Sequence, residues 1–264
     1  MGVDDRHRGP FSGPTGWIEE IGFAAMALAS CLALYLKIVL GRARLDMPAF
    51  TASLRQAGLS ILPAITLVTA SLGLILGHQI DAVLTDLDLP GLVVLSLTYA
   101  TVMEIVPILV GILVAGRAGV ALAVRQATLT VTGEMDGLLA SGIHPIQFTV
   151  GPVLLAMLLM SFAFMVWGTL VTFAAAGAWL WTMAGISPAL LFESLIRALS
   201  VGALIEALIK PLLFALLIAL IATVNGTRAG RNPEGIAGAA TRTMIGAVSA
   251  ILVMDLLYIV FLRV

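Results

Sequence analysis

Four ionisable residues lie inside strongly apolar stretches of the chain, and their positions are the most informative feature of the sequence. They are Glu104, Glu206, Lys210 and Asp255. A charged side chain at the centre of a lipid bilayer costs roughly 2.5–3.5 kcal/mol or more unless it is paired or hydrated. Residues kept at that cost line ion or substrate pathways or pair with one another, so these four are the first candidates for a functional site.

The spacing of these residues separates a structural interpretation from a functional one. Glu206 and Lys210 are four residues apart, so they share a helix face and can form an ion pair that neutralises both charges. Asp255 could be a functional residue or a polar packing contact between helices. Glu104 has no cation near it in the sequence. It must therefore face the interior of a helix bundle, a water-filled cavity or another subunit.

Sequence signatures of enzymes are absent. The chain has no GxxxxGK(S/T) phosphate loop, no HExxH and no GxSxG, so we do not expect it to hydrolyse ATP by itself. His7, His78 and His144 are far apart, and the single cysteine, Cys31, excludes an internal disulfide and a multi-thiolate metal site. We expect no catalytic residue, no metal and no cofactor; ATP would be bound by a partner.

The elements that position these residues are predicted to be membrane helices. Of the 264 residues, 60% are hydrophobic and only 11% are charged, whereas soluble domains carry about 25% charged residues. Such a surface must face lipid, and a net charge of −1 gives no attraction for nucleic acid. Five stretches are long enough to span: about 57–77, 91–115, 150–180, 201–224 and 244–262. Because lipid-facing backbone must satisfy its own hydrogen bonds, we predict an all-α polytopic membrane protein.

Residues 17–40 form a sixth apolar stretch that could either span the membrane or lie in its interface. Lys and Arg mark cytoplasmic loops, and the arginines alternate across the five predicted spans. The cytoplasmic segments hold Arg42, Arg44, Arg55, Arg117, Arg125, Arg228, Arg231 and Arg242, whereas the 80–90 loop holds Asp81, Asp86 and Asp88, and the 181–200 loop holds only Arg197. A sixth span would put the basic residues Arg6 and Arg8 outside. We therefore prefer an interfacial elbow helix over 17–45. It is the first part of one membrane domain over 17–264, which follows a disordered tail, residues 1–16.

The longest polar interruption, residues 116–145, is predicted to lie in the cytoplasm. Thr130, Thr132, Glu134 and Asp136 offer capping and first-turn acidic residues for a short helix. This helix would end at Ala140, with Ser141-Gly142 supplying the C-terminal cap. A short cytoplasmic helix between spans can contact a soluble motor protein, although a surface helix that binds nothing is the alternative.

At this interruption the sequence starts to resemble the MlaE/YrbE permeases, membrane subunits of ABC-type lipid transporters that work with MCE proteins. The similar segments cover about residues 50–264 in order. They are AGRAG at 115–119, TGEMDGL at 132–138, GIHP at 142–145 with Pro152, LGHQ at 76–79, MEIVP at 103–107, NG at 225–226, EGI at 234–236 and ATRT at 240–243, followed by Asp255. Taken together these motifs are fairly specific for the family, although none of them would be alone.

Several positions depart from the family pattern. Met103 stands where the family's RELGP motif has arginine, so a charged pair usual in the second span is missing. Arg125 and Leu139 replace acidic residues, and Gly133 replaces another polar one. These departures concern how an ATPase docks, and they identify a divergent member.

The resemblance implies a homodimer around a central lipid cavity in the bacterial inner membrane. It also implies a cytoplasmic ABC ATPase, an MCE-domain protein on the outer face and a small regulatory STAS-type protein. Among the lipid-cavity or intramembrane polar residues, the resemblance covers Glu104, Gln79, Pro107 and Asp255, and Glu206 and Lys210 are added because they are charges within a span. Those implied for the coupling helix are Arg117, Gly119, Glu134, Met135, Asp136, Leu138 and Pro145. A structural membrane anchor and an ion-coupled secondary transporter are the alternative functions.

Overall fold

The computed structural model describes residues 16–86, 90–183, 185, 187, 189–198, 200–230 and 232–262, and every regular element among them is helical. The short and terminal elements are α1 (Gly16–Val39), α2 (Met47–Leu54), the π-helical turn η1 (Arg55–Leu59), α7 (Glu134–Ala140), α8 (Pro145–Thr149) and α10 (Ala189–Ala198). The longer runs contain α3 (Leu62–Asp86), α4 (Pro90–Ala100), η2 (Thr101–Ile105), α5 (Val106–Val114), η3 (Ala115–Gly119), α6 (Val120–Val131), α9 (Gly151–Thr182), α11 (Val201–Thr227) and α12 (Pro233–Leu262).

Six helical runs are long and apolar enough to cross a membrane, which confirms the predicted class. They are Ile18–Val39, Met47–Val83, Leu95–Val131, Pro145–Thr182, Val201–Thr227 and Pro233–Phe261. The five predicted spans fall within the last five runs, once α4, which begins at Pro90, and the last residue of α12, Leu262, are included. The chain is therefore a multi-pass membrane protein.

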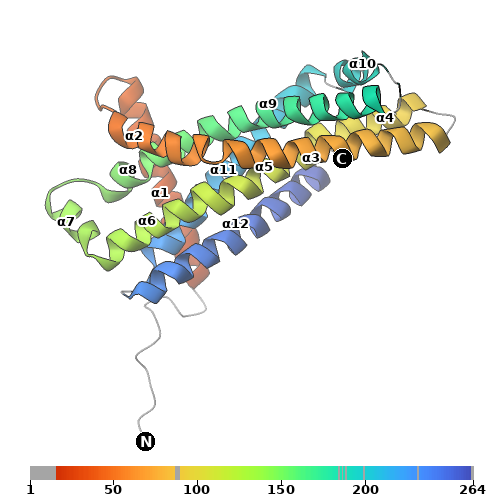
Figure 1. Cartoon of the computed structure of the whole chain (residues 1–264). Coiled ribbons are helices and arrows are strands. Elements are labelled where there is room, and N and C mark those ends of the chain that lie inside the picture. Colours follow the sequence, from red (N-terminus) through yellow and green to blue (C-terminus); the bar gives the residue numbers. More distant parts are fainter. Residues whose placement is uncertain are drawn as a thin grey trace, which may run out of the picture.

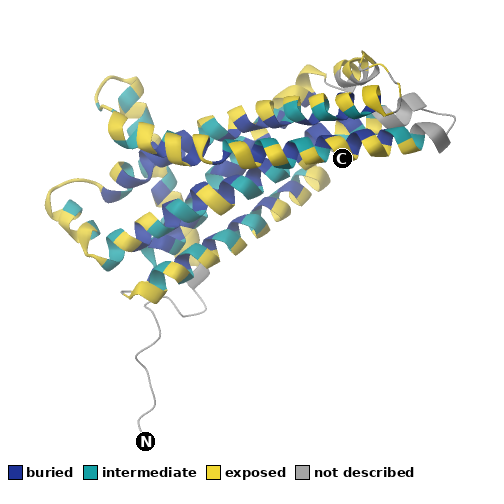
Figure 2. Ribbon diagram, viewed as in Figure 1, coloured by how far each residue is buried: buried dark blue, intermediate teal, exposed yellow. Residues whose placement is uncertain are grey.

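Helix α11 is the centre of the bundle. It packs against α1, α5, α6, α9 and α12, and its inner face, including Phe214 and Ile218, is buried. Figure 1 shows α3, α5, α9, α11 and α12 running together along the long axis of the molecule. In Figure 2 their inward faces are buried and their outward faces exposed, as expected where the outward faces meet lipid.

Helices α3 and α9 pack closely along their length, and two glycines permit the approach. A Cβ on Gly73 would lie 2.2 Å from the Thr172 carbonyl oxygen, and one on Gly77 would lie 2.8 Å from the Cβ of Trp179. Glycines four residues apart form the small-residue face that lets membrane helices pack backbone to backbone. The hydroxyl of Thr172 uses this proximity to donate a hydrogen bond to the carbonyl of Thr69 across the pair (3.1 Å).

The predicted polar interruption begins later than expected. Residues 90–131 form one continuous helical run, in which η2 and η3 are the π-helical turns. The first half of the predicted interruption, residues 116–131, is therefore helix rather than loop. The reason is packing: Leu122, Ala123, Gln126 and Ala127 repeat with helical spacing and are all buried. The rest of the predicted interruption consists of α7 and the turns on either side of it.

Helix α1 crosses one end of the bundle instead of running along it (Figure 1). It is attached there by a hydrogen bond from the Tyr35 hydroxyl to the carbonyl of Gly151 (2.7 Å) and by an ion pair between Glu20 and Arg228. The predicted tail lies outside the described residues except for Gly16, which is already the first residue of α1.

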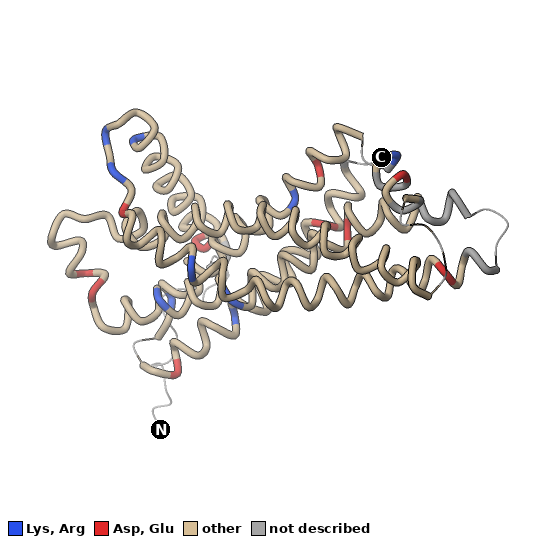
Figure 3. The backbone as a smooth tube through the Cα atoms, turned by 45° about the horizontal axis from the view of Figure 1, so that its top comes forward, with Lys and Arg blue, Asp and Glu red and all other residues tan. Residues whose placement is uncertain are grey.

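Basic residues gather at the end of the bundle that carries α2 and α7, which we name the basic end (Figure 3). Apart from Arg197 and Lys210, the described Lys and Arg residues are Lys37, Arg42, Arg44, Arg55, Arg117, Arg125, Arg228 and Arg242. Few charges interrupt the middle of the bundle in the same view. By the distribution of Lys and Arg, this end is expected to face the cytoplasm.

Candidate functional site

A buried ion triad joins three helices in the middle of the bundle. The ammonium of Lys210, on α11, donates to Oε2 of Glu104 at 2.7 Å and to Oδ1 of Asp255, on α12, at 2.8 Å. It also donates to the backbone carbonyl of Met103 at 3.0 Å. An ammonium has three N–H donors, and these three acceptors match them.

The carbonyl of Met103 is available because of Pro107. In an α-helix the carbonyl of residue i accepts from the N–H of residue i+4, and proline has no N–H to give. Met103 and Glu104 also lie in the π-helical turn η2, a geometry found frequently at functional sites. Proline and π turn together present one backbone oxygen and one carboxylate to the same cation.

The triad is deeply placed. Lys210 is 1% exposed and Asp255 is 5% exposed, whereas 20% of the Glu104 side chain is accessible. The ring of Tyr258, one turn after Asp255, lies 4.9 Å from the Lys210 nitrogen and adds a cation–π contact. Glu104 is thus the member of the triad with the most room to move.

This arrangement supports electrostatics rather than covalent chemistry. An ammonium that donates to three acceptors is a poor nucleophile, and removing Lys210 would leave two buried carboxylates without a cation. Among the described residues, no group of three or more His, Cys, Asp and Glu side chains could hold a metal ion. What the triad can do is tie η2, α11 and α12 together and release them when Glu104 or Lys210 finds another partner.

The triad changes the interpretation of the intramembrane residues. Glu104 faces the bundle interior, one of the three surroundings that the sequence left open. Lys210, from another helix, supplies the cation that the chain lacks at Met103. The acceptors of the Lys210 hydrogen bonds come from η2 and α12 and not from its own helix, where Glu206 is half-buried. The triad does not include Gln79, which is exposed on α3.

The short helix predicted to end at Ala140 is present as α7, with the end that the sequence indicates. It runs from Glu134 to Ala140, and Gly142, with φ of +74°, allows the turn that follows Ser141. No side chain of α7 is buried; Glu134 and Asp136 are exposed in its first turn, and Met135 and Leu138 are half-buried.

The threonine caps predicted for α7 are wrong. The helix begins after Gly133, whose φ of +76° is left-handed, and no side chain caps it. Thr130 and Thr132 donate instead to the carbonyls of Gln126 and Thr128, four residues back on α6. Threonine hydroxyls readily make this alternative bond within a helix.

Three other residues assigned to the coupling helix lie elsewhere. Arg117 is exposed on η3, where its Nε lies 3.4 Å from the hydroxyl of Ser60. Gly119 is buried, and a Cβ there would lie 2.4 Å from Ile218, so its role is close packing with α11. Pro145 is buried as the first residue of α8.

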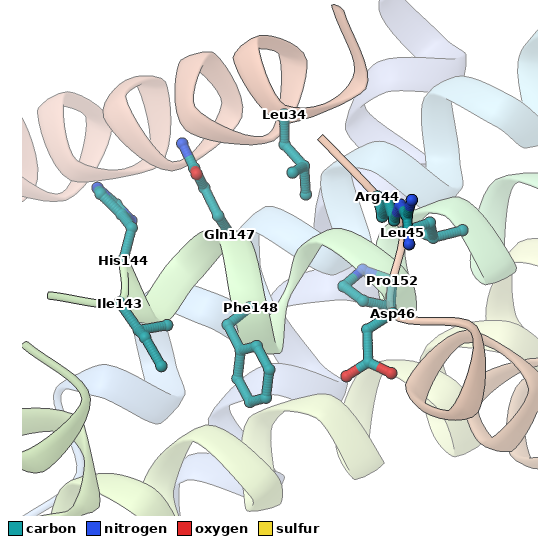
Figure 4. A pocket seen from close by; sticks show the side chains of 9 residues that line it. All are labelled: Leu34, Arg44, Leu45, Asp46, Ile143, His144, Gln147, Phe148 and Pro152. Carbon is teal, nitrogen blue, oxygen red and sulfur yellow. The ribbon is translucent and has the colours of Figure 1, made fainter. Parts of the chain in front are cut away.

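A small pocket of about 180 Å³ opens beside α8 at the basic end (Figure 4). Arg44 and Asp46 come from the segment before α2, Leu34 from α1, and His144 and Gln147 from the start of α8. Asp46 also caps α2 by accepting from the N–H of Ala49 (3.1 Å). Two of the lining positions, Ile143 and His144, lie between α7 and α8.

Comparison with known proteins identifies relatives of this arrangement. Residues 50–261 match the family model described as Permease MlaE. The chain is 29% identical over 150 residues to a Rickettsia felis protein named "Probable ABC transporter permease protein", across 55% of this chain and 52% of that protein. A protein of the same name from Rickettsia typhi is 33% identical over 103 residues, which cover 38% of each chain. The chain thus spans about half the length of the first relative and less of the second.

Proposed function

Because the chain belongs to the MlaE permease family, we propose that it is the membrane subunit of an ABC-type lipid transporter, with phospholipid as substrate. The observation that carries this proposal is the family match, which covers five of the six membrane-length helical runs and all members of the triad. The basic end faces the cytoplasm, α1 lies in that interface as an elbow, and a separate ATPase subunit supplies the energy. A periplasmic MCE-domain protein exchanges lipid at the other end.

Two copies of the chain are proposed to enclose the lipid path. Helix α12 has a largely exposed apolar face, including Leu252, Leu256 and Val260, although it contributes Asp255 to the triad. Such a face suits both a second copy and acyl chains. The triad lies at the back of this helix, so a shift of α12 against α11 would strain it.

Transport is expected to depend on Glu104. In proteoliposomes that contain the permease, its ATPase and its MCE partner, Glu104→Ala should reduce ATP-driven movement of fluorescent phospholipid by about tenfold or more. One charge-assisted hydrogen bond contributes about 1.5–3 kcal/mol, and about 1.4 kcal/mol corresponds to a factor of ten. Glu193→Ala, which removes an exposed carboxylate from α10, serves as the matched control. Normal flux in Glu104→Ala, with assembly intact, would contradict the role of this residue.

The same proteoliposomes separate the alternatives. A structural anchor would hold the ATPase and the MCE protein together, and lipid would not co-purify between two copies of the chain. An ion-coupled transporter would move substrate on a proton or sodium gradient without the ATPase. ATP-dependent flux that is insensitive to both gradients supports the permease.

Docking of the ATPase is expected to depend on α7. Asp136→Lys reverses an exposed charge in its first turn and should weaken co-purification of the ATPase by about tenfold or more, since like charges across an interface cost several kcal/mol. The thermal midpoint of the permease alone should not change, because exposed substitutions stay within about 0.5 kcal/mol. Glu19→Lys makes the same change on α1 and should keep the ATPase bound. If both variants lost the same amount of co-purifying ATPase, α7 would not be part of the interface.

A further inference from the structure

A groove of about 410 Å³ lies between α1, α11 and α12, and its lining includes no member of the triad and no residue of α7. Its volume falls within the roughly 300–1,000 Å³ typical of small-molecule sites. The residues that matter for its chemistry are Glu20, Leu217, Ile221, Asn225, Arg242 and Gly246. Asn225 and Arg242 are about 15 and 13 residues from Lys210 and Asp255 on the same helices, which separates groove and triad by about 20 Å along the bundle.

The polar end of the groove carries a net positive charge. Glu20 is paired with Arg228, which neutralises both. In the part of the chain that the structure describes, the exposed guanidinium of Arg242 has no ion pair and no hydrogen bond. The amide of Asn225 lines the groove with it. One unneutralised cation beside a hydrogen-bonding amide matches the needs of a phosphate group.

The rest of the groove is apolar and extends in one direction. Ile221 and Leu217 lie one and two turns before Asn225 on α11, so the hydrocarbon lining runs about 12 Å from the polar end toward the middle of the membrane. Gly246, one turn after Arg242 on α12, keeps the wall open: a Cβ there would only touch Ile221, at 3.5 Å. A longer side chain at position 246 would project into the groove.

We propose that this groove binds one anionic phospholipid of the leaflet at the basic end, with its phosphate on Arg242 and Asn225 and an acyl chain along Ile221 and Leu217. The order of the groups favours this occupant, because a cation at the interface followed by hydrocarbon toward the bilayer centre is the order of an amphiphile. A bound lipid also bridges α1 to α11 and α12, next to the ion pair of Glu20 and Arg228. The site does not depend on whether the chain transports lipid.

The test titrates the purified full chain in detergent with palmitoyl-oleoyl phosphatidylglycerol and counts bound lipid by native mass spectrometry. Arg242→Gln should weaken binding of the tightest lipid by about tenfold, the loss of one charge-assisted contact. Gly246→Leu, which fills the apolar part, should weaken it comparably. Arg55→Gln removes an exposed arginine of the basic end that does not line the groove, and it should bind like the wild type. Thermal midpoints of all variants check that each is folded, and Arg242→Lys should restore part of the affinity.

Each other outcome overturns the proposal. Equal weakening by Arg242→Gln and Arg55→Gln would mean general attraction to the basic end. Tight binding of glycerophosphoglycerol, which has the headgroup and no acyl chains, would mean an anion site without a lipid groove. Dissociation of a dimer by Gly246→Leu, with phosphatidylglycerol binding unchanged, would assign the groove to a second copy of the chain.

Discussion

Lys210→Met is expected to lower the free energy of unfolding of the purified chain by about 3–5 kcal/mol and to abolish transport, because removing one partner of a buried ion pair leaves uncompensated charge. Methionine fills much of the same volume, so lost packing contributes little. The carboxylates of Glu104 and Asp255 and the carbonyl of Met103 would all lose their shared donor. The measurement is thermal or denaturant unfolding in detergent, together with lipid flux in proteoliposomes.

Two comparisons isolate the triad in this experiment. Lys37→Met changes the same residue type at an exposed site on α1 and should cost less than about 0.5 kcal/mol. Lys210→Met combined with Glu104→Gln and Asp255→Asn removes all three charges and should recover most of the stability without recovering transport. If Lys210→Met unfolds at the wild-type midpoint, the ion triad does not hold these helices together.

Gly73→Ala is expected to destabilise the chain by about 1–3 kcal/mol, the usual cost of overpacking, by forcing α3 and α9 apart. The added methyl would lie 2.2 Å from a backbone oxygen of α9, at Thr172, and a backbone atom cannot rotate away as a side chain can. The hydrogen bond from Thr172 to the carbonyl of Thr69 should lengthen or break with the same movement. Loss of the folded peak in size-exclusion chromatography at elevated temperature provides the readout.

The control is the same substitution where space is free. Gly22 lies on α1 with no atom within 4 Å of its added Cβ, so Gly22→Ala should be neutral or slightly stabilising, since alanine favours helix more than glycine does. Equal midpoints for Gly73→Ala and Gly22→Ala would contradict the close α3–α9 contact.

Hydropathy sufficed to predict the membrane helices, because each needs a long apolar run whatever its neighbours are. The end of α7 was predictable too, since Gly142 marks a left-handed residue directly after the helix. The start of α7 was not, because a threonine hydroxyl can cap the next helix or bond back to its own, and sequence does not decide between these.

The triad could be predicted only in part. Spacing along one helix suggests Glu206 as the partner of Lys210, but the Lys210 contacts come from residues 45 to 107 positions away. Which helices become neighbours depends on how all of them pack together, so it cannot be predicted from the spacing of residues along one helix. One local signal was available: Pro107 leaves the carbonyl of Met103 without its usual donor, which indicates that a donor must come from outside the helix.

The helical run from residue 90 to residue 131 is unbroken, so Glu104 and the segment that leads to α7 belong to one continuous helix. The distance from Glu104 to Val131 is about 40 Å at 1.5 Å per residue, and η3 is the one π-helical turn between them. A continuous helix can transmit a rotation from either of its ends to the other. If movement at its basic end strains the contact between Glu104 and Lys210, then the coupling free energy between that contact and the basic end is the same in both directions. Binding of a ligand near Glu104 and binding of a partner at α7 would then be energetically coupled, although the two sites are far apart.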